Sequence, residues 1–134
     1  MAESNDDLRA LIVQVLRAEG VLRAERGRGT VLFTGATASL RGGARFSALA
    51  VGKVGLRALA QSTAREYAPA GVHVAHVIID GQIDLPRTRE AQPDRESHTF
   101  LSPDAIAESY WHLCSQDRTA WTQEMDLRPA VEKF

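Results

Sequence analysis

The spacing of hydrophobic residues along this chain switches repeatedly between the period of a helix and that of a strand. Near the N-terminus, a spacing of three and four residues predicts an amphipathic helix, formed by Leu8, Leu11, Ile12, Val15 and Leu16. Two runs rich in β-branched residues, Thr30–Thr34 and Val72–Ile79, predict buried strands. The second run is almost continuously apolar, which is typical of a strand covered on both faces in a parallel sheet.

The segments around these strands predict two further helices, a loop and a last strand. Residues 45–67 follow a helical pattern that is dense in alanine and glycine, so we expect another backbone to approach closely and the helix to pack on two sides. Ser102-Pro103 is a typical helix start, and this helix is expected to reach about residue 116. Residues 86–99 show no period and predict an exposed, mobile segment, whereas residues 121–127 predict a strand.

The resulting alternation of helix and strand favours an α/β fold in which parallel strands carry helices on both faces. A length of 134 residues favours one domain. The expected segments are a helix (1–28), a strand with a loop of small residues (29–43), a long helix (44–71), a strand and turn (72–84), an exposed loop (85–101), and a helix, last strand and tail (102–134).

Composition and charge exclude several classes of partner. The formal net charge is −1, and acidic residues interleave with the arginines, so we expect neither a nucleic-acid nor a membrane partner. Apolar runs are too short to span a bilayer. The single cysteine, Cys114, excludes an internal disulfide and favours a reduced, cytoplasmic compartment; its helical context predicts a buried or half-buried thiol. Four histidines and one cysteine give no recognisable ligand set, so we expect no metal.

Several segments together resemble one enzyme family. Residues 29–42 resemble the fifth strand and active-site loop of short-chain dehydrogenases/reductases, residues 53–66 their Tyr-x-x-x-Lys helix, residues 70–81 their sixth strand, and residues 120–129 their last strand. The resemblance implies a partial Rossmann-like αβα sandwich with about three parallel strands. It covers the C-terminal half of the family's domain and lacks the N-terminal βαβ unit, so it implies a truncated domain.

The resemblance also assigns catalytic positions. Lys53 matches the family's lysine, but Leu49 occupies the tyrosine position and Ala36, thirteen residues earlier, the serine position. Residues four apart share a helix face, so a lysine there lowers the pKa of a tyrosine and lets it transfer a proton; leucine has no proton to transfer. Thr37 and Ser39 are weak substitutes for the missing hydroxyl, and Lys53 is expected to be vestigial.

For the cofactor, the resemblance implies NAD or NADP, although its binding is doubtful for two reasons. Gly35, Lys53, Gly81 and Ile83 match positions around the nicotinamide and its ribose. However, the chain has no glycine-rich turn to hold a pyrophosphate at a helix N-terminus. In addition, Asp84 places a negative charge where the cofactor phosphates tend to lie, which makes phosphate binding less favourable.

Three functions therefore remain open. In the first, the chain is an oxidoreductase on an alcohol or carbonyl substrate when a partner chain completes it. In the second, it is a catalytically inactive remnant that associates with itself or regulates full-length relatives. In the third, it is a small-molecule binding module. The residues favour the inactive remnant for the isolated chain. We expect a homo-oligomer formed through the helices at residues 7–26 and 45–67, with a full-length relative as a second possible partner.

Overall fold

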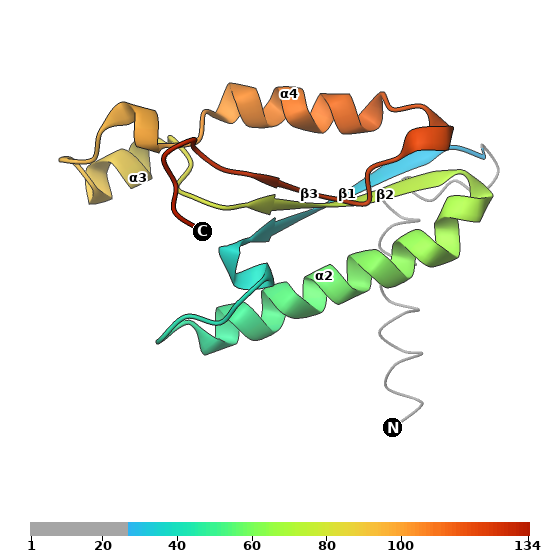
Figure 1. Cartoon of the computed structure of the whole chain (residues 1–134), viewed down its shortest axis with the longest axis horizontal. Helices are drawn as coiled ribbons and strands as arrows, with labels where there is room; N and C mark the ends of the chain where they lie inside the picture. Colours follow the sequence, from blue (N-terminus) through green and yellow to red (C-terminus); the bar gives the residue numbers. More distant parts are fainter. Residues whose placement is uncertain (1–26) are drawn as a thin grey trace.

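In the computed structural model, residues 27–134 can be described, and they form a three-stranded sheet with helices on both faces (Figure 1). The predicted helix at residues 1–28 lies almost entirely outside this range. The longer elements are β1 (Gly29–Ala36), α2 (Ser47–Tyr67), β2 (Val72–Ile79), α3 (Pro86–Ala91), α4 (Pro103–Cys114) and β3 (Glu124–Leu127). Short 3-10 turns follow at η2 (Thr37–Ser39), η3 (Ala68–Ala70), η4 (Ser97–Thr99) and η5 (Arg118–Ala120).

The three strands are parallel and lie in the order β1-β2-β3, which confirms the predicted partial Rossmann-like α/β fold. β1 and β2 run in register from Gly29 opposite Val72 to Ala36 opposite Ile79. All eight residues of β2 are buried, because this central strand has neighbours on both edges and helices on both faces. Its continuous apolar pattern follows from that position.

Helix α4 covers one face of the sheet and α2 covers the other (Figure 1). On the α4 face, Ala75, Val77 and Ile79 pack with the fully buried Leu113. On the α2 face, Val31, Val72 and Val74 pack against side chains near the C-terminal end of α2. Consecutive residues of β2 serve opposite faces, so one strand supplies both layers of the core.

Helix α2 packs on one side only within the described part of the chain, which differs from the predicted packing on two sides. Val51 is 75% exposed and Val54 is 47% exposed, and Gly52 and Gly55 have open space where a Cβ would stand. The small residues are therefore not explained by contacts within residues 27–134. A face that carries exposed valines and glycines on a regular helix is available to another surface.

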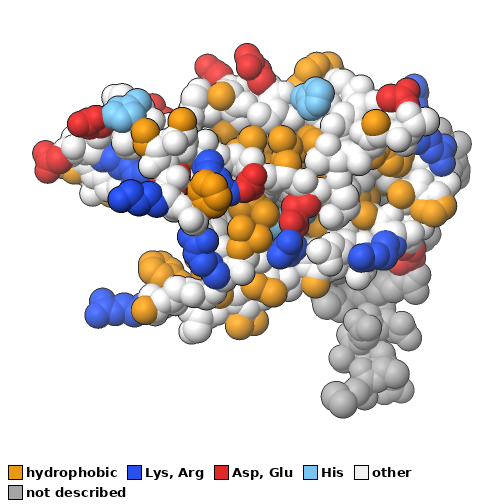
Figure 2. All heavy atoms as spheres, viewed as in Figure 1, with side chains coloured by type: hydrophobic (Ala, Val, Ile, Leu, Met, Phe, Trp, Pro, Cys, Tyr) orange, Lys and Arg blue, Asp and Glu red, His pale blue; other side chains and the backbone are white. Residues whose placement is uncertain are grey.

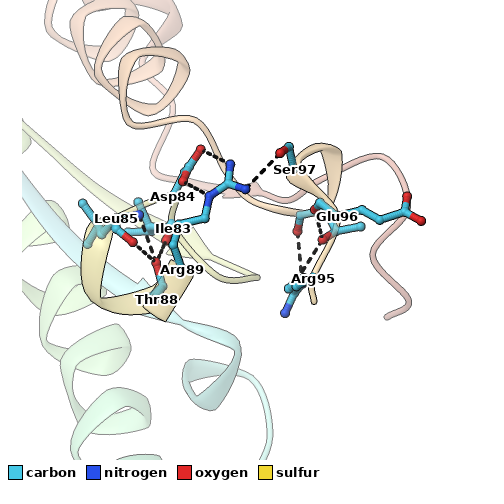
Figure 3. Close-up of polar contacts among 9 residues, drawn as sticks. Ile83, Asp84, Leu85, Thr88, Arg89, Arg95, Glu96 and Ser97 are labelled. Atoms are coloured by element: carbon cyan, nitrogen blue, oxygen red, sulfur yellow. Dashed lines mark hydrogen bonds and ion pairs between the residues drawn. The ribbon is translucent and has the colours of Figure 1, made fainter. Parts of the chain in front are cut away.

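The segment predicted as an exposed, mobile loop contains the short helix α3 and folds back on itself (Figure 3). Arg89 of α3 donates to both carboxylate oxygens of Asp84, at 2.6 and 2.7 Å, and to the Ser97 hydroxyl at 2.9 Å. The segment ends in the buried residues Phe100 and Leu101. Ion pairs between near neighbours order it without any hydrophobic period, which is why the sequence pattern missed it.

Two further observations concern the surface. The Cys114 thiol is exposed, so the prediction of a buried or half-buried thiol is wrong; Leu113 takes the inward position of that helical turn instead. Within residues 27–134, none of the helices combines the length and apolar character that crossing a membrane requires.

Candidate functional site

The candidate site is a hollow where the carboxyl ends of β1 and β2 separate into their following turns. Such an edge is where open parallel sheets bind ligands. The surface is hollowed between the segment around α3 and the loop that precedes α2 (Figure 2). A cavity of about 310 Å³ lies here, lined by Ala36, Thr37, Ala38, Arg41, Gly42, Gly43, Phe46, Leu49, Ile79, Gly81 and Gln82.

Ala36 and Leu49, at the family's serine and tyrosine positions, both line this cavity. The fold therefore brings together two positions that are thirteen residues apart in sequence. One carries a methyl group and the other an isobutyl group, so neither can give or take a proton. The two side chains make this part of the wall apolar.

Lys53 lies one helical turn beyond Leu49, but it is not among the residues that line the cavity. Its ammonium group donates to the backbone carbonyl of Thr34 at 3.0 Å. Thr34 is on β1, which has no neighbouring strand on its outer side among the described residues. Lys53 thus caps an unpaired carbonyl of an edge strand in this structure.

A second cavity, of about 250 Å³, adjoins the first and shares its wall at Ala36, Ile79, Gly81 and Gln82. Gly35 and Ile83 also line it, so three of the four predicted cofactor positions meet here and Lys53 stands apart. Gly81 has a φ of 151°, and an added Cβ would stand 3.0 Å from Pro129 Cδ. This close approach explains why the turn after β2 requires glycine.

Ser39 is buried and is not among the lining residues of either cavity. Its hydroxyl accepts the backbone N–H of Ala36 at 3.1 Å. It therefore stabilises the turn after β1, and its burial removes it from contact with a ligand. Of the two residues proposed to supply a substitute hydroxyl, only Thr37 lines the cavity.

The Thr37 hydroxyl donates to Asp80 Oδ1 at 2.5 Å. Asp80 directly follows β2 and is only 3% exposed. Its second oxygen faces the Arg128 guanidinium, with Nε at 3.6 Å. No motif in the sequence marks Asp80; the available signal is an acidic residue immediately after a buried strand, at the edge where the site forms.

A cluster of three charged or polar side chains joins α2 to the face of the sheet that it covers. Arg57 of α2 donates to both oxygens of Glu124 on β3, each at 2.7 Å, and His76 Nδ1 lies 3.0 Å from Glu124 Oε2. The hydrogen bond from Arg57 lowers the pKa of Glu124, burial opposes that shift, and the contact with His76 adds to the lowering. This group links α2 to two strands, and His76 is fully buried within it.

Asp84 was expected to repel cofactor phosphates, but the structure pairs its carboxylate with Arg89 (Figure 3). The two-pronged hydrogen bond from Arg89 lowers the pKa of Asp84, and desolvation of the carboxylate opposes this shift. The guanidinium balances the carboxylate locally, so the net charge at this point is close to zero. Within residues 27–134, no group of three histidine, cysteine or acidic side chains could hold a metal ion.

Comparison with known proteins agrees with this geometry. No protein-family model matches the sequence, and no curated protein matches it. Among solved structures, a short-chain dehydrogenase from Rhodopseudomonas palustris is 47% identical, with a TM-score of 0.62; the match covers 81% of this chain and 42% of that one.

Two more distant structures share the fold. A short-chain oxidoreductase from Pseudomonas aeruginosa PAO1, described as containing an atypical catalytic centre, is 18% identical with a TM-score of 0.71, and the match covers 89% of this chain and 53% of that one. An actinorhodin polyketide ketoreductase with NADPH is 21% identical with a TM-score of 0.70, covering 92% and 54%. The chain thus has the short-chain dehydrogenase/reductase fold, confirming the resemblance, and spans about half the length of the solved structures that it matches.

Proposed function

We propose that this short-chain dehydrogenase/reductase-like chain, as it stands, is catalytically inactive and acts by associating with a second subunit. One observation carries the proposal: the cavity at the carboxyl ends of β1 and β2 presents Ala36 and Leu49 where the family's chemistry requires a hydroxyl and a phenol. General acid–base catalysis contributes typically ~10²–10⁴ in rate. Neither side chain can supply it.

The described residues fit only one end of a nicotinamide dinucleotide. The cavity of about 250 Å³ beside Gly35, Gly81 and Ile83 could receive a planar ring, and Lys53 stands one helical turn from Leu49. For the pyrophosphate, no Gly-x-x-x-Gly-x-Gly turn leads into α2 or α4, the two longer helices within residues 27–134. A whole dinucleotide therefore does not fit these residues, and we derive no reaction step through it.

The exposed side of α2 supports association. Val51 and Val54 stand on it beside Gly52 and Gly55, which leave room for a close approach. Among residues 27–134 no strand pairs with the outer edge of β1, and such an edge favours pairing with another chain. A second copy of this chain, or a longer relative that retains the missing half of the fold, would cover both features.

A second candidate is an oxidoreductase acting on an alcohol or carbonyl, completed by such a partner. The 47% identity to a short-chain dehydrogenase favours it. In this case NAD or NADP would bind across the two subunits, with Gly81 and Ile83 at the nicotinamide. Leu49 and Ala36 would still have to be replaced by groups of the partner.

Titration with NADH and NADPH tests the two candidates. The inactive chain should show no saturable change in nicotinamide fluorescence up to millimolar cofactor, and the double substitution Ala36→Ser with Leu49→Tyr should not create binding or activity. Saturable binding by the unmodified chain at micromolar concentration would contradict the proposal. Activity gained only in the double variant would show instead that the cofactor site is intact and that the two side chains alone were limiting.

A further inference from the structure

His76 is a fully buried histidine whose two ring nitrogens have different surroundings. Its side chain is 0% exposed. Nδ1 lies 3.0 Å from Glu124 Oε2, whereas Nε2 is buried and has no hydrogen-bond partner within residues 27–134. Buried polar atoms are normally paired. The free nitrogen on a titratable ring in the core is therefore the feature to explain.

The hydrogen bonds on the Nδ1 side of the ring have a fixed direction. Arg57 donates to both oxygens of Glu124, each at 2.7 Å, and this hydrogen bond lowers the pKa of Glu124. Glu124 is therefore a carboxylate at neutral and mildly acidic pH, and a carboxylate can only accept. Nδ1 of His76 must then carry the proton in this contact. In the uncharged ring, Nε2 is consequently a bare acceptor.

On the other side of the ring, Nε2 faces the turn that follows β1. Nε2 and Ser39 Oγ both lie within 2.6 Å of the point where a Cβ on Gly35 would stand. Ser39 is buried, and its hydroxyl accepts the backbone N–H of Ala36 at 3.1 Å. Ser39 Oγ is thus a neighbouring oxygen that could accept a proton from Nε2, although no hydrogen bond joins the two atoms in this structure.

Acidification changes this arrangement, because histidine is the side chain that takes up a proton in the mildly acidic range. A new N–H at Nε2 would be a buried donor in need of an acceptor. We propose that His76 is a pH-sensitive switch beneath the turn after β1: its second proton draws the Ser39 hydroxyl toward Nε2, weakens the hydrogen bond to Ala36 and reshapes the adjoining cavity wall. That wall contains Ala36, Thr37 and Ala38. The switch does not depend on cofactor binding or catalysis.

The charged groups around the ring act in both directions. Glu124 of β3 lies 3.0 Å away and stabilises a positive ring. Arg57 of α2 opposes it from the far side of Glu124, as does the loss of hydration at a fully buried position. Lys53 stands one turn earlier on α2 and donates to the backbone of β1, while Asp80 at the end of β2 is held by a threonine hydroxyl. β1 and η2 carry no charged residue, so Glu124 is the group that allows a second proton on this ring.

NMR of the full ¹⁵N-labelled chain between about pH 7.5 and about pH 5 tests the switch. Long-range ¹H–¹⁵N spectra of the imidazole rings report the tautomer and charge of each histidine. His76 should carry its proton on Nδ1 at the upper end of this range and gain a second on Nε2 at the lower end. With the same midpoint, the protection factor of the Ala36 N–H against hydrogen exchange should fall roughly 2- to 12-fold, as expected for the loss of one hydrogen bond. A ring that stays uncharged throughout, a neutral ring protonated on Nε2, or an unchanged protection factor would overturn the proposal.

Two matched variants assign the response to one ring. His76→Gln should abolish the pH dependence of the Ala36 protection factor, whereas His98→Gln, which alters an exposed histidine beside Glu96, should leave it intact. A response that persists in His76→Gln would show that the proposal is wrong. If His76→Gln fails to fold, Ser39→Ala replaces it, because this variant removes the acceptor and keeps the ring. The protection factor of Ala36 should then no longer follow the charge of His76, and continued coupling would contradict the switch.

Discussion

Gly35 shows how tightly the end of β1 is built around buried polar groups. A Cβ at this position would stand 2.3 Å from His76 Nε2 and 2.6 Å from Ser39 Oγ. Both neighbours are buried, and Ser39 is held by the Ala36 backbone. Because glycine has only a hydrogen at this position, the strand can pass close to His76 and enter the turn that forms the site.

Replacing Gly35 with alanine should destabilise the fold by about 2–3 kcal/mol, since overpacking a rigid core site costs about this much. Gly55→Ala is the matched control. Gly55 lies on α2 with open space around its Cβ position, so alanine there should be neutral or stabilise by up to ~1 kcal/mol, provided that the chain is kept dilute enough to prevent the proposed association through this face. The free energy of unfolding of both variants is measured by urea denaturation. Equal values would mean that the residues around Gly35 can move aside.

Between secondary-structure elements, the ion pair of Arg57 with Glu124 holds helix α2 to strand β3. The Glu124 side chain is 23% exposed, and both of its oxygens accept from Arg57. The hydrogen bond from Arg57 lowers the pKa of Glu124 in the folded state below the 4.5 of a free glutamate. The unfolded chain therefore binds a proton at this group at a higher pH than the folded chain does.

This difference predicts how stability depends on pH. The contribution of Glu124 is fully present above the unfolded pKa of about 4.5 and is lost as the pH falls through the lower folded value. Glu124→Gln should reduce the loss of stability between pH 5 and pH 3, when urea unfolding is followed across that range. Asp104→Asn, an exposed acidic side chain in the first turn of α4, is the control. An identical pH profile for wild type and Glu124→Gln would show that the pair carries no such contribution.

Helix α4 packs on the sheet through its buried face, whereas its outer face is exposed. Leu113 is fully buried against Ala75 and Val77, whereas Trp111, two residues earlier, is 74% exposed. Leu113→Ala should cost about 3–5 kcal/mol, because removing a buried leucine side chain leaves a cavity. Trp111→Ala should change the free energy of unfolding by less than ~0.5 kcal/mol. A similar loss in both variants would mean that the outer face of α4 is covered by something in solution.

For the whole molecule, the proposed association makes a direct prediction. Val51 is 75% exposed on the open face of α2, so Val51→Glu should abolish or strongly weaken a dimer that buries this face. Ala107→Glu adds the same charge to the exposed side of α4 and should leave the dimer unchanged. Sedimentation velocity at micromolar concentrations distinguishes the two. A wild-type chain that is strictly monomeric there would contradict association through α2 with a second copy.

The local patterns of this sequence were sufficient for the three strands, for α2 and α4, and for their order along the chain. β2, α2 and α4 follow from an apolar run, a helical period and a Ser-Pro start, and each signal lies within a few neighbouring residues. α3 was missed because it is held by ion pairs such as Asp84 with Arg89, which leave no periodic trace. Family resemblance assigned Ala36 and Leu49 to the serine and tyrosine positions, and that both residues line one cavity is seen only in the structure.

The sequence by itself determined the α/β class, the family resemblance and the side chains at the catalytic positions, because these depend on residue type and short spacing. Only the tertiary structure decided which polar groups meet. Thr37 and Asp80 are 43 residues apart, and Arg57 and Glu124 are 67 apart. The register of the parallel strands sets such contacts. The same packing buries Ser39 and places Thr37 in the cavity wall, because the path of the backbone after β1 sets the position of each residue.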